Sequence, residues 1–110
     1  MRNFQNTYKF RHSIRQTKEK PLGWINNQLR KYTENYLDTL PDKSDVEYIE
    51  FAKQDIRGLP SISIVYGANR GHCIGKQLHF KTYDHMLTYI QGYNAGIDEL
   101  RYTWQNQTPY

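Results

Sequence analysis

The sequence predicts one α+β domain in which a three-stranded antiparallel sheet is covered on one face by helices, in the order α-β-β-β-α. Two long segments repeat apolar residues every three or four positions, which is typical of helices that bury one face. The stretch between them alternates and contains a glycine-rich turn, which is typical of antiparallel strands. At 110 residues we expect a single core, because two cores would each be too small to be stable.

The first predicted helix lies between two prolines. Pro21 suits a first helical position, where its missing N–H costs nothing, and Pro41 stops the helix because its ring cannot continue the turn. The apolar positions between them fall three or four residues apart: Leu22, Ile25, Leu29, Tyr32, Tyr36 and Leu40. This stripe predicts a helix that packs one face against the sheet.

The three strands are predicted in the centre of the chain. Residues 46–53 are dense in β-branched and aromatic types, which favours a strand, although the preceding residues also match a helix capping box and leave a helix as the alternative. Residues 61–66 alternate and predict a half-buried strand, and residues 72–80 return as its neighbour. The two glycines in 67–71 predict the hairpin loop that joins them.

The second predicted helix covers residues 84–104, and Thr82 or Asp84 is expected to cap it. Its apolar stripe is the longest in the chain: Tyr83, Leu87, Ile90, Tyr93, Ile97, Leu100 and Trp104. Gly92 and Gly96 each cost ~1 kcal/mol relative to alanine, which indicates a close approach of another backbone or a bend. The last residues, 105–110, are predicted to form a polar tail.

This stripe is longer than a small sheet can cover, because a helix over 84–104 spans about 31 Å and a six-residue strand about 20 Å. The excess residues are expected to pack elsewhere: Ile97, Leu100 and Trp104. One prediction is a two-fold homodimer in which they meet a second copy of the chain. The alternative is that Trp104 closes the core against Leu22 and Trp24 of the first helix.

The positive charge is concentrated in two segments. The chain has a net charge of +4, and residues 1–20 carry six basic side chains and one acidic side chain. These residues lack a sustained apolar period and could form either a short strand around Tyr8 to Phe10 or a disordered arm. We expect a basic N-terminal arm that is dispensable for folding, followed by a single domain over 21–104. A second run, residues 56–81, contains four basic residues and no acidic ones.

Composition excludes several classes of protein. The single cysteine has no internal partner, which argues against a disulfide-stapled secreted domain. The chain has no apolar run near the ~18 residues of a membrane span, and its first twenty residues have no apolar segment typical of a signal peptide. We therefore expect a cytoplasmic protein that does not act in a membrane.

No pattern typical of catalysis or metal binding is found. The glycine-rich segment before Lys76 lacks the spacing of a phosphate-binding loop and the hydroxyl residue that should follow the lysine. The candidate metal ligands are His72, Cys73, His79 and His85. Strand alternation separates His72 from Cys73, and Cys73 and His79 would lie about 20 Å apart, too far for one ion. Nothing nearby activates Cys73 as a nucleophile, so we expect no enzyme activity, cofactor or metal.

Basic and aromatic residues together predict a binding surface. The expected contact residues are Arg11, Arg15, Arg57, Tyr66, Arg70, His72, Lys76, His79 and Lys81. Cations of this kind contact phosphates, and exposed aromatic rings stack on single-stranded bases. The alternative is a solvated hairpin with ordinary surface charges. The ten tyrosines have two interpretations as well, either contact area at an interface or the rim of a small core.

Two resemblances follow from these features. The element order over 21–104 resembles the double-stranded RNA-binding domain, but the place of that family's lysine motif reads Lys81-Thr82-Tyr83-Asp84-His85-Met86, with one lysine and an acid. The chain also resembles the small accessory proteins of bacteriophages and mobile elements, which are short, tyrosine-rich and cysteine-poor. That second resemblance implies a protein that binds and blocks a host macromolecule.

The sequence therefore favours a non-catalytic binding protein. We expect a phage or mobile-element accessory protein, active in the host cytoplasm, that binds and blocks a host protein or nucleoprotein complex, as an anti-defence inhibitor would. The alternative is a nucleic-acid-binding protein that uses the basic arm and the central hairpin.

Overall fold

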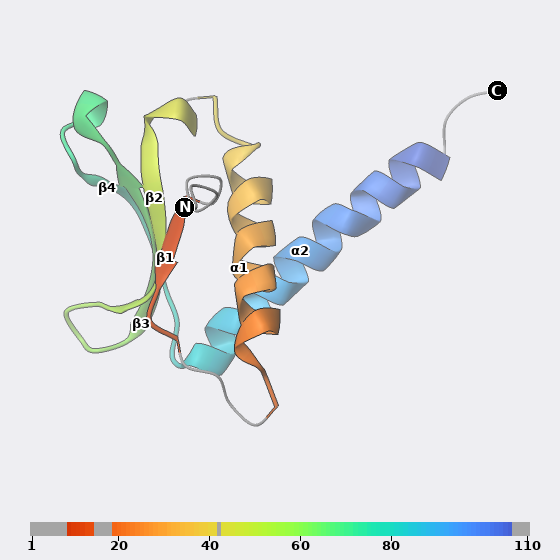
Figure 1. Cartoon of the computed structure of the whole chain (residues 1–110), viewed down its shortest axis with the longest axis horizontal. Helices are drawn as coiled ribbons and strands as arrows, with labels where there is room; N and C mark the ends of the chain where they lie inside the picture. The colour runs from red at the N-terminus through yellow and green to blue at the C-terminus, as the bar shows by residue number, and fades with distance from the viewer. Residues whose placement is uncertain (1–8, 15–18, 42, 107–110) are drawn as a thin grey trace, which may run out of the picture.

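The computed structural model describes the backbone of residues 9–14, 19–41 and 43–106, and side chains up to Tyr102. Six helices and strands follow one another along the chain (Figure 1): β1 (Phe10–His12), α1 (Leu22–Leu37), β2 (Val46–Gln54), β3 (Pro60–Tyr66), β4 (Ile74–His79) and α2 (Tyr83–Asn106). Two short 3₁₀ turns, Lys43–Asp45 and Ala68–Arg70, precede β2 and β4. The α+β class is as predicted, with the order β-α-β-β-β-α.

The sheet has four strands and is mixed, in the order β1-β2-β3-β4. The three antiparallel strands β2, β3 and β4 match the prediction, and residues 46–53 are a strand rather than a helix. The prediction of three strands was wrong because β1 pairs parallel with β2, placing Phe10 opposite Ile49 and His12 opposite Phe51. A three-residue strand carries no pattern of its own, and its pairing with a strand some 40 residues away is what forms it.

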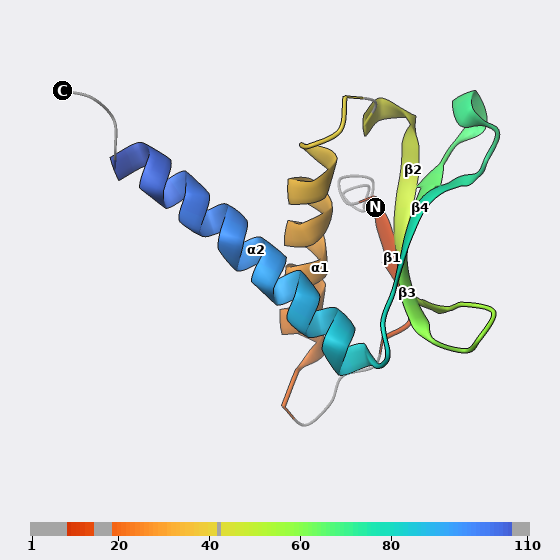
Figure 2. The same ribbon diagram turned by 180° about the vertical axis from the view of Figure 1, so that it is seen from behind.

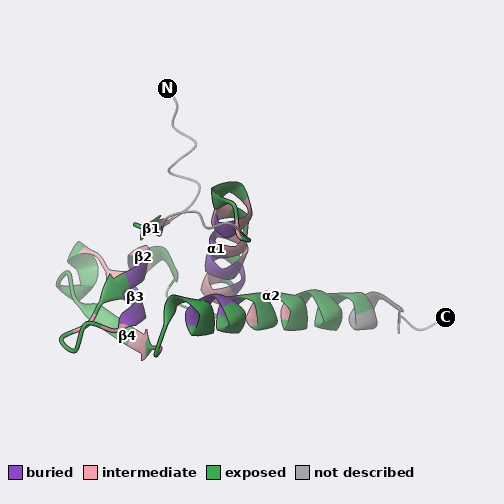
Figure 3. Ribbon diagram, turned by 90° about the horizontal axis from the view of Figure 1, so that it is seen from below, coloured by how far each residue is buried: buried purple, intermediate pink, exposed green. Residues whose placement is uncertain are grey.

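Both helices lie on one face of the sheet, as predicted (Figures 1 and 2). The core between the layers is formed by the apolar residues of α1, the sheet and the first turns of α2: Ile25, Leu29, Tyr32, Val46, Ile49, Phe51, Ala52, Ile62, Ile64, Met86, Leu87 and Ile90. Figure 3 colours the residues by burial and shows that the buried positions of α2 lie in its first turns, while the part farther from the sheet is mostly exposed.

The helix ends differ slightly from the expected ones. Pro21 has an extended conformation and forms the N-cap of α1, so the first helical residue is Leu22. The helix ends at Leu37 rather than Leu40, because the following residues form tight turns in which Leu40 N–H donates to Leu37 O. Thr82 rather than Asp84 caps α2, since its Oγ1 accepts a hydrogen bond from His85 N at 3.1 Å.

A polar contact holds α1 and α2 where they cross. Asn94 is buried, and its Nδ2 donates to Gln28 O and Gln28 Oε1 at 3.0 Å. Asn35 Nδ2 donates to Asn94 Oδ1 at 3.3 Å, and Lys31 Nζ lies 2.9 Å from Asp98 Oδ2. The amide bonds give the buried side chains of Asn35 and Asn94 partners, and the exposed Lys31–Asp98 pair lies beside them, so these contacts fix the point at which the two helices cross.

Beyond this crossing, α2 projects away from the rest of the fold (Figures 1 and 2). We call its second half, residues 95–106, the α2 limb. A Cβ added at Gly92 or Gly96 would meet nothing within 4 Å, so these glycines do not mark a close approach of another backbone. Within the described part of the chain, neither helix is long and apolar enough to cross a membrane.

Candidate binding surfaces

The predicted contact residues do not gather in one patch. In the register of β3 and β4, Ser61 pairs with His79 at one end and Val65 with Ile74 at the other. Arg57, His79 and Lys81 therefore lie at the end with the β2–β3 turn. The remaining hairpin residues, Tyr66, Arg70 and His72, lie at the β3–β4 loop. The two groups are roughly 20 Å apart at ~3.3 Å per residue.

The β2–β3 turn is organised by one carboxylate. Asp55 Oδ1 accepts hydrogen bonds from Arg57 N at 2.8 Å and Leu59 N at 2.9 Å. Its Oδ2 accepts from His79 Nδ1 at 2.8 Å and Arg57 Nη2 at 3.2 Å. The Asp55 side chain is only 5% exposed, although it belongs to a surface turn. Arg57 and His79 thus have a structural partner in the chain.

These contacts favour the charged form of the carboxyl group. The backbone amide of Leu59 is the largest cause that lowers the pKa of Asp55, to about 2. Desolvation of the carboxyl opposes this shift, while the Arg57 and His79 contacts add to it. At neutral pH the Asp55 carboxyl group is therefore charged, which is the form that accepts these hydrogen bonds. At the tip of the turn the side chain of Ile56 is fully exposed.

The β3–β4 loop forms the opposite end of the sheet and is balanced in charge. Arg70 Nη1 lies 3.6 Å from Asp45 Oδ2, and His72 Nδ1 lies 3.9 Å from Glu47 Oε1. The Arg70 guanidinium also lies over the ring of Tyr66, 4.7 Å from its centroid. A hollow of about 360 Å³ lies beside the loop, lined in part by Asp45, Glu47 and His72. Acidic side chains therefore accompany the cations predicted to contact phosphate.

The last predicted cations are spread over other parts of the sheet. The Arg11 guanidinium on β1 lies 3.9 Å from the centroid of the Tyr48 ring. Lys76 on β4 has its ammonium nitrogen 6.0 Å from the centroid of the Tyr36 ring on α1. Lys81 is exposed just after β4, and Arg15 lies outside the described residues. No continuous basic stripe is formed by the cations whose side chains the structure describes.

Several of the tyrosines belong to the core rather than to an interface. Tyr32 is 1% exposed, and its ring centroid lies 4.9 Å from that of Tyr93 on α2. Desolvation by burial, with neighbouring tyrosines, raises the pKa of both hydroxyls. Tyr36 stacks on Tyr32 at 5.8 Å, and Tyr89, 40% exposed, forms the outer edge of this cluster. These rings join the two helices to each other.

The predicted absence of a metal site or catalytic cysteine stays a prediction. In the described ranges, no three His, Cys, Asp or Glu residues converge as metal ligands would. Cys73 is exposed, and its thiol lies 3.1 Å from the carbonyl oxygen of Arg70. His79, the other candidate ligand on β4, is bound to Asp55 at the far end of that strand.

The α2 limb exposes apolar side chains, and Leu100 is one that the sequence singled out. Leu100 and Tyr102 are each 67% exposed, and Ile97 is half-buried near the helix crossing. Leu100 therefore does not extend the core. The side chain of Trp104, and with it the predicted contact to Leu22 and Trp24, lies outside the described residues.

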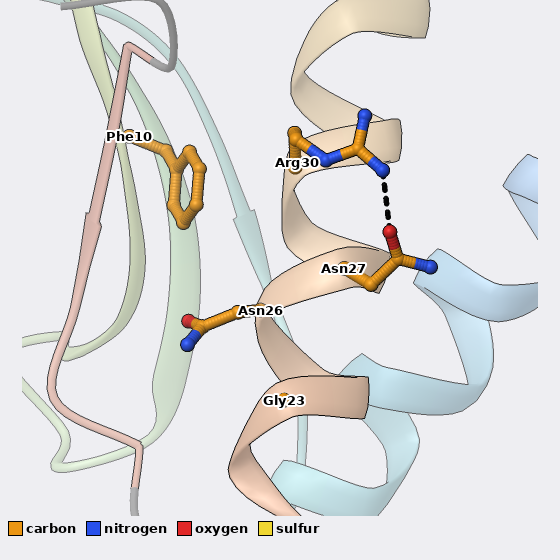
Figure 4. A pocket seen from close by; sticks show the side chains of 5 residues that line it. All are labelled: Phe10, Gly23, Asn26, Asn27 and Arg30. Carbon is orange, nitrogen blue, oxygen red and sulfur yellow. Dashed lines mark hydrogen bonds between the residues drawn. The ribbon is translucent and has the colours of Figure 1, made fainter. Parts of the chain in front are cut away.

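Two hollows follow the boundary between β1 and α1, which we call the β1–α1 seam. The first, about 480 Å³, is lined by Phe10, Gly23, Asn26, Asn27 and Arg30 (Figure 4). The second, about 560 Å³, is lined by Lys9, Thr33, Glu34, Leu37, Asp38, Lys43 and Ser44. In Figure 4 the Phe10 ring on β1 faces Asn26 across the seam, while Arg30 and Asn27 are joined by a hydrogen bond on α1.

Two of these features were not predicted from the sequence. Asp55 followed by Gly58 between two strands is a signal for a side-chain-stabilised turn, and it was available in the sequence. The β1–α1 seam had no such signal, because it depends on the pairing of β1.

Comparisons with family models, with curated proteins and with solved structures gave no match for this chain. The chemistry of the surfaces is therefore the guide to function.

Proposed function

We propose that this chain is a non-catalytic binding protein that docks on another protein through the α2 limb. The observation that carries the proposal is the exposure of Leu100 on a helix that projects beyond the fold. A leucine side chain exposed to water in this way gains nothing from burial within the chain, whereas an apolar groove on a partner would bury it. The function is then recognition, with the α+β body as a support for the limb.

The charge of the α2 limb favours a protein partner over nucleic acid. Its charged residues are Asp98, Glu99 and Arg101, and Asp98 is already paired with Lys31. A surface that contacts phosphates needs an excess of cations, which this segment lacks. An amphipathic helix with exposed leucine and tyrosine instead fits the groove of a folded protein. The partner we propose is a host protein or nucleoprotein complex, blocked by this contact, and the chain an accessory protein of a phage or mobile element.

The test compares the intact chain with limb variants. Proteins captured from bacterial lysate are identified, purified and titrated against the chain by calorimetry. We expect Leu100→Ser to weaken binding at least tenfold. The matched control is Ala95→Ser, an exposed position on another side of the same helix, which should bind as the wild type does. A purified partner that binds Leu100→Ser with unchanged affinity would contradict docking through the limb.

A second candidate function, nucleic-acid binding, is favoured by the β2–β3 end of the sheet. Lys53, Arg57 and Lys81 are exposed at that end of the sheet, near Asp55. Titration with single-stranded and duplex oligonucleotides at rising salt separates the two functions. A steep loss of affinity with salt, reduced in Arg57→Ala, indicates phosphate contacts. No binding of either oligonucleotide at low salt rules this function out.

A further inference from the structure

β4 forms the border of the sheet opposite β1 (Figure 3), and one side of its backbone has no partner strand. The phase of its pairing with β3 is set by Phe80, whose N–H donates to Pro60 O at 3.0 Å. In an antiparallel pair, residues that bond to the neighbour alternate with residues whose N–H and C=O point away. Along the register from Phe80, Leu78 therefore bonds to β3, while Gln77 and His79 direct their backbone groups to the outer edge.

This outer edge of β4 is accessible. Residues 67–83, which include β4 and the segments beside it, are described throughout, and His79 is exposed while Gln77 is half-buried. No turn, loop or side chain in the described ranges bonds to the backbone N–H or C=O of Gln77 or His79. Such an edge can accept a strand whose own N–H and C=O groups pair with it.

The side chains of the two outward-facing residues hold the edge in place. On the sheet face away from the helices, Gln77 Nε2 donates to Ser63 Oγ at 2.9 Å. His79 Nδ1 lies 2.8 Å from Asp55 Oδ2 at the end of the strand. Both side chains are therefore engaged within the chain, and the backbone groups are what the edge offers to a partner. An edge that is already ordered loses little conformational freedom on binding.

The side chains of β4 that face the helices give the edge a pattern of its own. Leu78 and Phe80 are partly buried against the core, and the Phe80 ring centroid lies 5.3 Å from that of Tyr89, which is 40% exposed on α2. Lys76 is exposed on the same face, with its ammonium nitrogen 6.0 Å from the centroid of the Tyr36 ring. A strand beside β4 would thus meet one cation and two apolar side chains at alternate positions.

The charge around this edge selects the kind of partner. Lys76 and Lys81 are exposed, and neither forms an ion pair with another residue that the structure describes. Residues 56–81 contain no acidic side chain. A second copy of β4 would bring further cations and no acid to the contact, which disfavours self-pairing. An acidic side chain on a different chain would instead form a favourable cross-strand pair with Lys76.

We propose that the outer edge of β4 binds an extended acidic segment of another protein, which adds to the sheet antiparallel to β4. The backbone of the segment pairs with Gln77 and His79. Two apolar side chains at alternate positions lie opposite Phe80 and Leu78, and an Asp or Glu two positions later lies opposite Lys76. This surface lies on different residues from the α2 limb, so it stands or fails independently of the function proposed above.

The probes are two libraries of dodecapeptides displayed on phage and selected on the intact chain. Both hold Leu-x-Leu-x at the centre, followed by Glu in one library and by Lys in the other. We expect enrichment over an unrelated bait from the Glu library alone. Enriched peptides are synthesised, and their affinity is measured by fluorescence anisotropy. A scrambled peptide of the same composition should bind roughly tenfold more weakly or less, because the pattern and not the net charge is recognised.

Two substitutions at Gln77 isolate the backbone contact. Gln77→Ala removes the side-chain bonds to Ser61 and Ser63 but keeps the backbone N–H. Gln77→Pro removes the same bonds and also the N–H on the outer edge, which proline tolerates in an edge strand. We expect Gln77→Pro to bind the peptide about tenfold more weakly than Gln77→Ala does. Circular dichroism and urea unfolding show whether each variant is folded.

The same contact can be removed without changing the chain. The peptide residue between the second Leu and the Glu lies opposite Gln77, so N-methylation of that residue removes its hydrogen bond to Gln77 O. We expect this peptide to bind about tenfold more weakly than the unmethylated one. Methylation of the next residue toward the C-terminus, the Glu opposite Lys76, is the control, because its N–H points away from β4 and its loss should change the affinity little.

The charge contact is tested by reversing one lysine. Lys76→Glu should weaken binding of the Glu peptide by roughly tenfold, because like charges then face each other across the strands. The matched control is Lys53→Glu, an exposed lysine on β2 with the same change in net charge. Its affinity should stay within about threefold of the wild type, because the charge at that distance is screened by salt.

Other outcomes overturn the proposal. These are equal enrichment from both libraries or from neither, unchanged affinity of the N-methylated peptide, and equal weakening by Lys76→Glu and Lys53→Glu. Amide shifts in NMR spectra that map to the α2 limb instead of β4 would do the same. If the wild type sediments as a dimer that Gln77→Pro dissociates, the occupant is a second copy of the chain. Leu100→Ser should leave peptide binding unchanged, which separates this result from the test of the limb.

Discussion

Among single residues, Asp55 shows how one side chain can set the shape of a turn. Its carboxylate binds two backbone amides, a guanidinium and an imidazole, and the backbone closes the turn through Asp55 N–H to Leu59 O at 2.8 Å. The contacts within the turn are local and could be predicted from Asp55 and Gly58 in the sequence. The contact with His79 could not, because it needs the register of β3 and β4.

Asp55 should make stability depend on pH in acid. Its pKa is about 2 in the folded chain and near 3.9 when unfolded. The folded value is the lower one, so this stabilisation is present above about pH 4 and is lost as the pH falls toward 2. Asp55→Asn cannot titrate and should lack this loss. In urea unfolding measured from pH 2 to 5, the midpoints of the wild type and of Asp55→Asn should therefore differ most at pH 5 and converge near pH 2.

The control for this pH series is Asp84→Asn, because the Asp84 side chain is 86% exposed. Its midpoints should run parallel to those of the wild type throughout. A wild-type curve that also runs parallel to Asp55→Asn between pH 4 and 2 would show that the Asp55 contacts do not stabilise the fold.

Gly75 is a second residue whose role depends on a contact distant in sequence. A Cβ at this position would lie 2.1 Å from Cε2 of Tyr66, so the Tyr66 ring would have to move. We expect Gly75→Ala to lower the free energy of unfolding by about 1–3 kcal/mol, as overpacking does. Gly92→Ala, where the added Cβ meets nothing, should raise it by about 0.5–1 kcal/mol. Urea unfolding measures both, and equal effects of the two substitutions would contradict the packing of Tyr66 on Gly75.

At the scale of elements, the sequence predicted those that carry a pattern of their own. Both helices and the three antiparallel strands were found from apolar spacing, because that spacing matches the period of the element. For β1 the sequence left two alternatives, a short strand around Tyr8 to Phe10 or a disordered arm, because Phe10–His12 is too short for a period and lies in a basic segment. Its formation depends on β2 and on α1, which no local pattern in residues 1–20 reports.

The presence of β1 changes what we expect from the N-terminal segment. The Phe10 ring packs edge-to-face on Phe51 at 6.0 Å and is partly buried against the core. We expect Phe10→Ala to lower the free energy of unfolding by about 1–3 kcal/mol, less than a fully buried phenylalanine would. Arg11→Ala, an exposed neighbour stacked on Tyr48, should cost under about 1 kcal/mol. If thermal unfolding shows no loss for Phe10→Ala, the packing of Phe10 on Phe51 does not stabilise the fold.

At the scale of the whole molecule, the α2 limb gives the chain its shape. The radius of gyration of the Cα atoms is 15.3 Å, whereas a compact domain of this length would have roughly 13 Å. The apolar stripe of α2 could be predicted from the sequence, but the residue at which the rest of the fold stops covering this stripe could not. That point is set by Asn94 and Asp98, whose contacts with α1 end the packed half of the helix.

The same geometry bears on the predicted two-fold dimer. An antiparallel pair of limbs centred on Leu100 would form a seam about 18 Å long at 1.5 Å per residue. Two helices that meet along so short a seam bury much less than the roughly 1,200 Å² of a stable interface. In such a pair each residue beside the seam meets its own copy, so Glu99 would face Glu99 and Arg101 would face Arg101. Like charges facing each other across a short seam weaken the dimer, so we expect self-association to be weak.

Sedimentation velocity over a range of concentrations tests this prediction. The wild type should be a monomer at low micromolar concentration and begin to associate only toward the millimolar range. Leu100→Ser should abolish that association, while Ala95→Ser, exposed on another side of the helix, should leave it unchanged. A wild type that sediments as a dimer at low micromolar concentration, and as a folded monomer after Leu100→Ser, would mean that a second copy covers the limb. The limb could then bind a partner only by first releasing that copy, and the affinity of any partner would depend on the concentration of the chain itself.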